Sequence, residues 1–122
     1  MDIDIRVKRA YEAAGPDDGC RVLVDRLWPR GLSKEKFTFD LWCKALAPTP
    51  GLRKWFGHKA EHWAGFREAY ENELRSPEQR ARMRELLRQA SQPVVTLLYA
   101  ARDTEHNHAV VLAAELARQA RK

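Results

Sequence analysis

Two short apolar runs, each followed at once by charged and turn-forming residues, constrain the fold of this chain more than any other feature. Residues 20–25 read CRVLVD and lead into RLWPRG, while residues 94–99 read VVTLLY and lead into AARDTEHNH. Runs of this length and composition predict β-strands. In open α/β sheets, ligands bind beyond the carboxyl ends of parallel strands. If the two strands are parallel neighbours, their polar ends therefore meet in one site.

A further strand is expected near the amino terminus. Residues 3–8 alternate apolar and polar side chains, which is typical of a half-buried strand near a sheet edge. The turn sequence GPDDG at residues 15–19 separates this strand from the next one. The connection is short enough for either a tight crossover or a hairpin, so the direction of the first strand stays open.

Helical spacing and capping side chains predict the helices. They are expected to span residues 33–46, a short turn at 52–56, residues 60–75, residues 77–90 and a last helix ending near residue 120. Ser33 is the expected cap of the first. Ser76 followed by proline, with Gln79 three residues on, forms a capping-box pattern. Asp103 or Thr104 is the expected cap of the last helix.

The order β-β-α-α-α-β-α predicts a single compact α/β domain over residues 1–122. Three layers are expected, with a small, mostly parallel sheet flanked by helices. A length of 122 residues suffices for one domain with a substantial core.

Composition narrows the class of protein. The longest apolar stretches are too short to span a bilayer, and no signal-peptide pattern opens the chain, so we expect a cytoplasmic protein without membrane attachment. Cys20 and Cys43 lack metal-ligand spacing, and we expect reduced core cysteines and no metal site. The net charge of +5 favours anionic partners such as nucleic acid or phosphorylated small molecules. Motifs for Rossmann, P-loop, serine-hydrolase and zinc-protease sites are absent.

The end of the strand at 94–99 carries the densest cluster of candidate site residues. Arg102 offers a bidentate fork for phosphate or carboxylate. His106 and His108 add imidazole groups that can transfer protons, and Asp103 would open a helix whose free N–H groups attract anions. A purely structural role, with Asp103 as a cap and the histidines solvated, is the alternative. The two histidines lie two positions apart and so do not form a metal pair on a helix.

The loop after the strand at 20–25 supplies the second half of the expected site. Arg26 and Arg30 can bind an anionic group, and Trp28 can stack on a flat ring. Asp25, at the strand end, is the acid–base candidate. The alternative is an ion pair between Asp25 and a neighbouring arginine, with Trp28 covering the core.

Two further clusters are more ambiguous. Arg53 and His58 could reach the rim of the site from the segment LRKWFGH. Arg80, Arg84 and Arg88 recur at intervals of four and would line one side of a helix, which could lie along nucleic acid. Interspersed glutamates favour a solvated helix face instead.

Three segments carry a resemblance to a known family. RVLVDRLWPRGLSKEK at 21–36, LRKWFGH at 52–58 and LLYAARDTEHNHAVVL at 97–112 resemble the YeaO-like branch of the domain of unknown function 488 family. The resemblance covers essentially the whole chain and implies a compact bacterial α/β domain whose reaction is not established. Other branches end in a pattern close to CAEKDPEHCHR.

This chain matches that pattern only in part, with Asp103 at its aspartate and His108 at its second histidine. Tyr99 and Asn107 stand where those branches have cysteines, and Ala109 stands where they have arginine. Thiol chemistry is therefore not implied for this chain, while Arg102 can supply the missing positive charge.

These observations predict a pocket for an anionic small molecule, phosphorylated, nucleotide-like or carboxylate, at the strand ends. The expected proton-transfer residues, if there is catalysis, are Asp25, His106 and His108. The expected ligand-binding residues are Arg26, Trp28, Arg30, Arg53, His58, Tyr99, Arg102, Asp103 and Asn107. A nucleic-acid-binding module and a non-catalytic protein-interaction scaffold are the alternatives. Cofactor, reaction and oligomeric state are left open.

Overall fold

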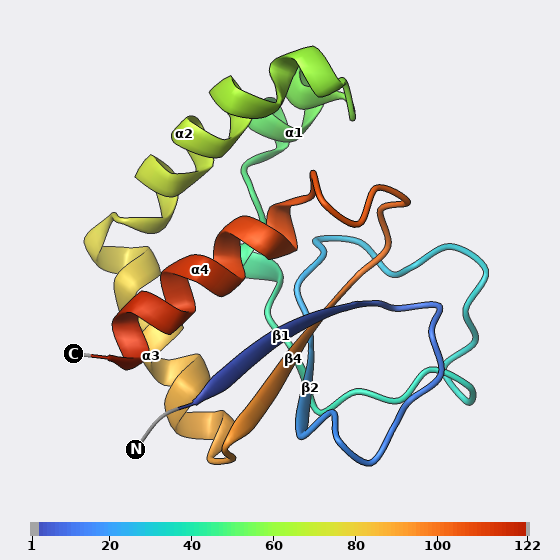
Figure 1. Cartoon of the computed structure of the whole chain (residues 1–122). Helices are drawn as coiled ribbons and strands as arrows, with labels where there is room; N and C mark the ends of the chain where they lie inside the picture. The colour runs from blue at the N-terminus through green and yellow to red at the C-terminus, as the bar shows by residue number, and fades with distance from the viewer. Residues whose placement is uncertain (1–2, 122) are drawn as a thin grey trace.

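The computed structural model describes residues 3–121 and shows a four-stranded parallel sheet (Figure 1). The strand order is β1-β4-β2-β3, with the bounds β1 Asp4–Arg9, β2 Cys20–Leu23, β3 Leu41–Trp42 and β4 Val94–Tyr99. All three pairings are parallel, so the first connection is a crossover rather than a hairpin. The expected parallel α/β sheet is confirmed, with β1 at one edge and β4 and β2 as central neighbours.

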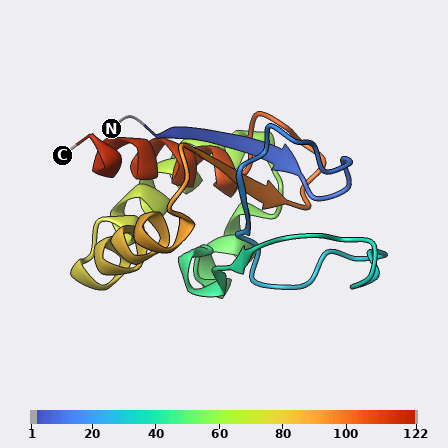
Figure 2. The ribbon, with the colours of Figure 1, turned by 90° about the horizontal axis from the view of Figure 1, so that it is seen from below.

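One face of the sheet packs against the helices. The helices are α1 (Pro50–Phe56), α2 (Trp63–Leu74), α3 (Pro77–Ala90) and α4 (His108–Ala120), with 3-10 turns η1 (Lys44–Leu46) and η2 (Ala60–His62). Val22, Val95 and Leu97 are fully buried in the core cluster that these helices complete. Figure 2 shows α4 lying along β1 and β4. Continuous burial on both strand faces explains why β2 and β4 do not alternate in sequence.

The other face is covered by loop rather than helix. Leu23 and Leu98 pack there against Phe37, and the partly buried Trp28 and Phe39 extend the same cluster. The rings of Trp28 and Phe37 meet edge to face, with centroids 5.5 Å apart. In Figure 1 the segment that carries these aromatic residues lies beyond β2, on the side away from α4.

The helix expected over residues 33–46 is wrong. This stretch forms turns, the two-residue strand β3 and the 3-10 turn η1. The backbone of Asp40 donates to the Arg21 carbonyl oxygen (2.7 Å), while Asp40 Oδ2 accepts from the Arg21 backbone N–H (2.8 Å). Pairing with β2 provides hydrogen-bond partners for backbone N–H and C=O groups that would otherwise be paired within a helix. This pairing is a long-range interaction, so the local spacing of residues does not predict it.

Helix starts are partly as expected. Ser76 caps α3 by accepting from the Gln79 backbone N–H, but the Gln79 side chain donates to the Ala45 carbonyl oxygen instead of closing the capping box. The expected cap of the last helix, Asp103 or Thr104, is wrong, because Asn107 caps α4. Residues 103–106 make a separate turn before it.

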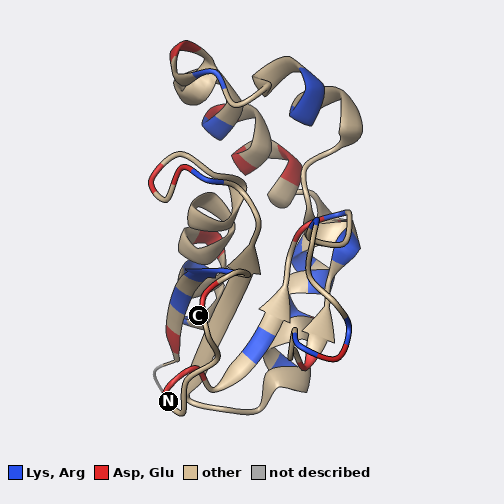
Figure 3. Ribbon diagram, turned by 90° about the vertical axis from the view of Figure 1, so that its right-hand side faces the viewer, with Lys and Arg blue, Asp and Glu red and all other residues tan. Residues whose placement is uncertain are grey.

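Charge is distributed over the whole fold. In the view of Figure 3, Lys and Arg positions occur on helices, strands and loops alike, with Asp and Glu between them. Within residues 3–121 no helix combines the length and apolarity needed to cross a membrane.

Candidate functional site

Two adjoining depressions lie at the carboxyl ends of β2 and β4, where the polar ends of the strands were expected to meet. One has a volume of about 370 Å³ and the other about 690 Å³. They share the lining residues Arg53, His58, Ala101 and His108. Together they are called the strand-end pocket below.

The strand-end pocket contains a close carboxylate–imidazole pair. Asp25 follows β2, and its Oδ2 accepts a hydrogen bond of 3.0 Å from the Ala100 backbone N–H at the end of β4. His108, the first residue of α4, places Nε2 3.2 Å from Asp25 Oδ1 and 3.1 Å from the Val24 carbonyl oxygen. Both neighbours are acceptors, so Nε2 carries the proton.

This arrangement determines what the histidine offers a ligand. The one Nε2 proton points to the Val24 carbonyl, which leaves the buried Asp25 Oδ1 in contact but without a hydrogen bond of its own. Within residues 3–121 the structure gives His108 Nδ1 no partner. Nδ1 is therefore available to accept a hydrogen bond when the ring is neutral and to donate one when it is protonated.

Cationic side chains border the pocket. Arg53 and Lys54 approach from α1, and Arg30 and Arg102 from the loops after β2 and β4. Within the part of the chain that the structure describes, none of the four has a side-chain hydrogen bond or an ion pair, and all are exposed. Four cationic side chains without ion pairs thus surround a concavity that also contains the carboxylates of Asp25 and Asp103, and this excess of positive charge favours an anion.

The acidic residue at the rim does not cancel this charge fully. Asp103 accepts hydrogen bonds from the backbone N–H groups of Glu105 (2.9 Å) and His106 (3.0 Å), and its other oxygen lies 3.0 Å from His106 Nδ1. These hydrogen bonds, led by the one from Glu105, hold the pKa of Asp103 below its usual value. The carboxylate is thus directed into its own turn.

A left-handed turn presents His58 to the pocket. Gly57 ends α1 with φ 52°, and His58 follows with φ 58°. Positive φ is uncommon for a residue with a side chain, and such residues cluster at functional sites. The turn sets the His58 ring 5.8 Å from the Phe56 ring, centroid to centroid.

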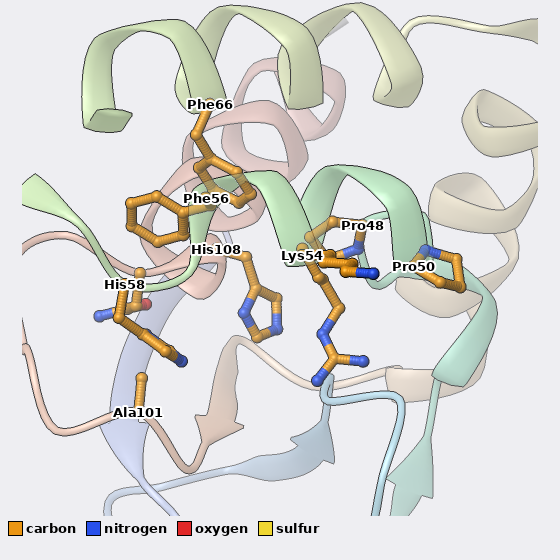
Figure 4. A pocket seen from close by; sticks show the side chains of 10 residues that line it. Pro48, Pro50, Lys54, Phe56, His58, Phe66, Ala101 and His108 are labelled. Atoms are coloured by element: carbon orange, nitrogen blue, oxygen red, sulfur yellow. The ribbon is translucent and has the colours of Figure 1, made fainter. Parts of the chain in front are cut away.

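Part of the pocket lining is apolar. Pro48, Pro50, Phe56 and Phe66 line it, and Figure 4 shows the His108 ring between the Phe56–His58 side and the Pro48–Lys54 side. Arg26 lies behind this wall, where one guanidinium nitrogen donates to the carbonyl oxygens of Ala47 (3.3 Å) and Pro48 (3.2 Å). The pocket thus pairs an apolar floor with a cationic rim.

Known sequences identify the family. A family sequence model described as "Inactive DUF488-N3 subclade" matches residues 4–122. The uncharacterized protein YeaO of Escherichia coli (strain K12) is 44% identical over 111 residues, covering 91% of this chain and 95% of YeaO. The chain is a YeaO-like member of the DUF488 family. The uncharacterized protein Rv3073c of Mycobacterium tuberculosis is 42% identical over 109 residues, covering 89% of this chain and 90% of that protein. No solved structure gives a significant match.

In this DUF488 member, eight of the twelve expected site residues line the strand-end pocket. They are Asp25, Arg30, Arg53, His58, Arg102, Asp103, Asn107 and His108. The structure thus brings together residues from three separate segments, two of which the sequence could connect only through the parallel-strand argument.

The other four expected residues lie outside the lining. Arg26 holds the Ala47–Pro48 backbone, and Trp28 belongs to the aromatic cluster on the far face, with Nε1 donating to the Leu32 carbonyl oxygen (2.7 Å). Tyr99 is buried beneath the helices, where burial raises its pKa. His106 pairs with Asp103 and meets the Trp63 ring edge to face.

Some lining residues were not expected from the sequence. Pro48, Pro50 and Phe66 line the pocket, although none of them was among the expected site residues. Lys54 stands beside Arg53 in the LRKWFGH segment, so the charge of that segment was the one signal that could have found it. Within residues 3–121 no group of three or more His, Cys, Asp or Glu side chains could hold a metal ion.

Asn107 does structural work at the edge of the pocket. Its Oδ1 accepts from the Val110 backbone N–H (3.2 Å), and its Nδ2 donates to the Asp103 carbonyl oxygen (2.9 Å).

We expect Asn107→Ala to lower the free energy of unfolding by about 1–2 kcal/mol, because a helix cap is lost. Urea unfolding measures this. Asn72→Ala, at an exposed position of α2, is the control and should change stability by less than about 0.5 kcal/mol. Equal losses in both variants would contradict the capping role.

Proposed function

We propose that this DUF488 member binds a small molecule carrying a phosphate or carboxylate group in the strand-end pocket, as a cytoplasmic protein. The observation that carries the proposal is the gathering of Arg30, Arg53, Lys54 and Arg102, all without partners within residues 3–121, around the Asp25–His108 pair. Arginine forks bind such groups through paired, charge-assisted hydrogen bonds.

The apolar part of the pocket supports an organic ligand rather than a bare ion. Phe56, Phe66 and the two prolines offer a surface for a flat or aliphatic moiety next to the cationic rim. Small-molecule sites typically combine an apolar lining with a few polar groups that orient the ligand. A nucleotide-like or phosphorylated compound has both parts.

Binding without turnover is the favoured form of this function. The family model that the chain matches is described as inactive. We therefore assign the Val24 carbonyl oxygen and the neighbouring Asp25 carboxylate to hold the His108 ring, with His108 Nδ1 contacting the ligand. A carboxylate-oriented imidazole is also the arrangement used for proton transfer, so the binding assay includes a check for product.

Calorimetric titration with a nucleoside monophosphate and the matching nucleoside tests the proposal. We expect the monophosphate to bind more tightly than the nucleoside, and Arg53→Gln to weaken monophosphate binding by about 10- to 100-fold, which corresponds to the loss of about 1.4–2.8 kcal/mol of charge-assisted hydrogen bonding. Chromatography of the mixture afterwards reveals any product.

Arg67→Gln is the matched control, since Arg67 is an exposed arginine on α2 that does not line the pocket. Unchanged binding by the Arg53 variant, or equal affinity for the nucleoside and the monophosphate, would contradict anion recognition at this site.

A further inference from the structure

A groove at the amino end of the sheet, remote from the strand-end pocket, has no role in the proposed function. It lies between α3 and the C-terminal part of α4 and has a volume of about 750 Å³. Figure 1 shows both chain termini at this end of the molecule. Five arginines border the groove: Arg75, Arg80, Arg84, Arg88 and Arg118. We call it the arginine groove.

The charge of the arginine groove is only partly neutralised. Among residues 3–121, the one acidic residue that lines it is the buried Glu115, whose Oε1 lies 3.1 Å from Arg75 and 3.7 Å from Arg118, so two cations share one carboxylate. Within residues 3–121, Arg80 and Arg84 have no side-chain hydrogen bond or ion pair. The groove therefore favours a partner that brings its own carboxylates.

The floor of the groove is aliphatic. Leu74 and Met83 are fully buried beneath it, and Ile3 and Leu87 are partly exposed to it. Phosphate-backbone binding depends on charge, and binding of single strands adds aromatic stacking platforms. None of the described residues that line this groove is aromatic. An aliphatic floor instead matches apolar anchors of a peptide.

The spacing of the arginines matches a helix. Arg80, Arg84 and Arg88 recur every four residues along α3, so they span about 12 Å at a rise of about 1.5 Å per residue. A partner helix laid along α3 would bring carboxylates at the same interval to Arg80 and Arg84, whereas Arg88 already pairs with Glu85 on its own helix.

We propose that the arginine groove binds an acidic amphipathic helix of a partner protein. The apolar side chains of the helix lie against the partly exposed Ile3 and Leu87, above the buried Leu74 and Met83, and its carboxylates face Arg80 and Arg84. The arginine groove then serves protein recognition and not nucleic-acid binding.

Fluorescence anisotropy with a labelled synthetic helix tests this proposal. The probe is a peptide of about twelve residues with glutamate at every fourth position beside a leucine face; a second peptide has glutamine in place of each glutamate. We expect saturable binding of the glutamate peptide only, weakened about tenfold or more in the double variant Arg80→Gln/Arg84→Gln.

Two further variants locate the contact. Arg82→Gln is the control on the same helix, because Arg82 lies outside the groove, and its affinity should equal that of the unmodified protein. Leu87→Ser should weaken binding through the floor. No binding up to about 1 mM peptide, or equal loss in the Arg82 variant, would overturn the proposal. The proposal would also be overturned if a single-stranded oligonucleotide displaced the labelled peptide and bound the Leu87→Ser variant as tightly as the unmodified protein. That result would indicate phosphate recognition.

Discussion

Asp18→Asn is expected to lower the free energy of unfolding by about 3–5 kcal/mol, because it leaves buried positive charge unpaired. Asp18 lies in the turn before β2 and is 8% exposed. Its Oδ2 accepts from Arg21 Nη1 (2.6 Å) and from the Gly15 backbone N–H (3.0 Å), while Lys8 Nζ contacts both oxygens, at 3.1 and 3.2 Å. The Arg21 side chain is itself only 8% exposed, so water cannot replace the lost carboxylate.

The same variant should alter the response to acid. The hydrogen bond from Gly15, followed by the contacts with Lys8 and Arg21, holds the pKa of Asp18 below its usual value. A carboxyl whose pKa is lower in the folded state stabilises the fold above the unfolded pKa, and this contribution is lost as the pH falls through the folded pKa. The unmodified protein should therefore lose part of its stability from about pH 5 downward, and Asp18→Asn should lack that component.

Urea unfolding at neutral and acidic pH measures both effects. Asp4→Asn is the matched control, since Asp4 pairs with Arg6 at the surface, where the two side chains are 53% and 48% exposed. Such a pair contributes at most about 1 kcal/mol. A loss of stability in the Asp18 variant no larger than that in the Asp4 variant would show that the buried cluster does not stabilise the fold.

Gly19→Ala is expected to destabilise the protein by about 3–5 kcal/mol, combining left-handed backbone strain with overpacking. Gly19 has φ 64°, and a Cβ atom there would lie 2.1 Å from the Val94 carbonyl oxygen. That oxygen belongs to the backbone at the start of β4, a central strand, so neither partner can move without disturbing the sheet.

Thermal and urea unfolding of Gly19→Ala and Gly31→Ala separate the two terms. Gly31 also has positive φ, 84°, but no atom lies within 4 Å of a Cβ placed there. The Gly31 variant should therefore lose only the strain term, about 1–2 kcal/mol. Similar losses in the two variants would mean that the contact with Val94 relaxes easily.

Local pattern was sufficient for much of the fold. The strands at 20–23 and 94–99 and the helices α2 and α3 appear where apolar spacing and the Ser76 cap predict them. The position of each of these strands and helices depends on which face of a short segment is apolar. The spacing of apolar residues within that segment specifies this face directly. The expected helix at 33–46 failed because its aromatic residues suit a loop packed on the sheet equally well, and pairing with Arg21 of β2 decided between the two.

The location of the candidate site is what the sequence by itself determined, because carboxyl ends of parallel strands meet at one edge of a sheet. Only the tertiary structure decided which side chains reach it. Arg26 and Arg30 belong to the same loop, yet Arg26 turns away to the carbonyls of Ala47 and Pro48 while Arg30 lines the pocket. The Asp25–His108 contact likewise depends on α4 being capped by Asn107 rather than by Asp103. Side-chain direction in a loop follows from partners distant in the chain, and no local pattern contains them.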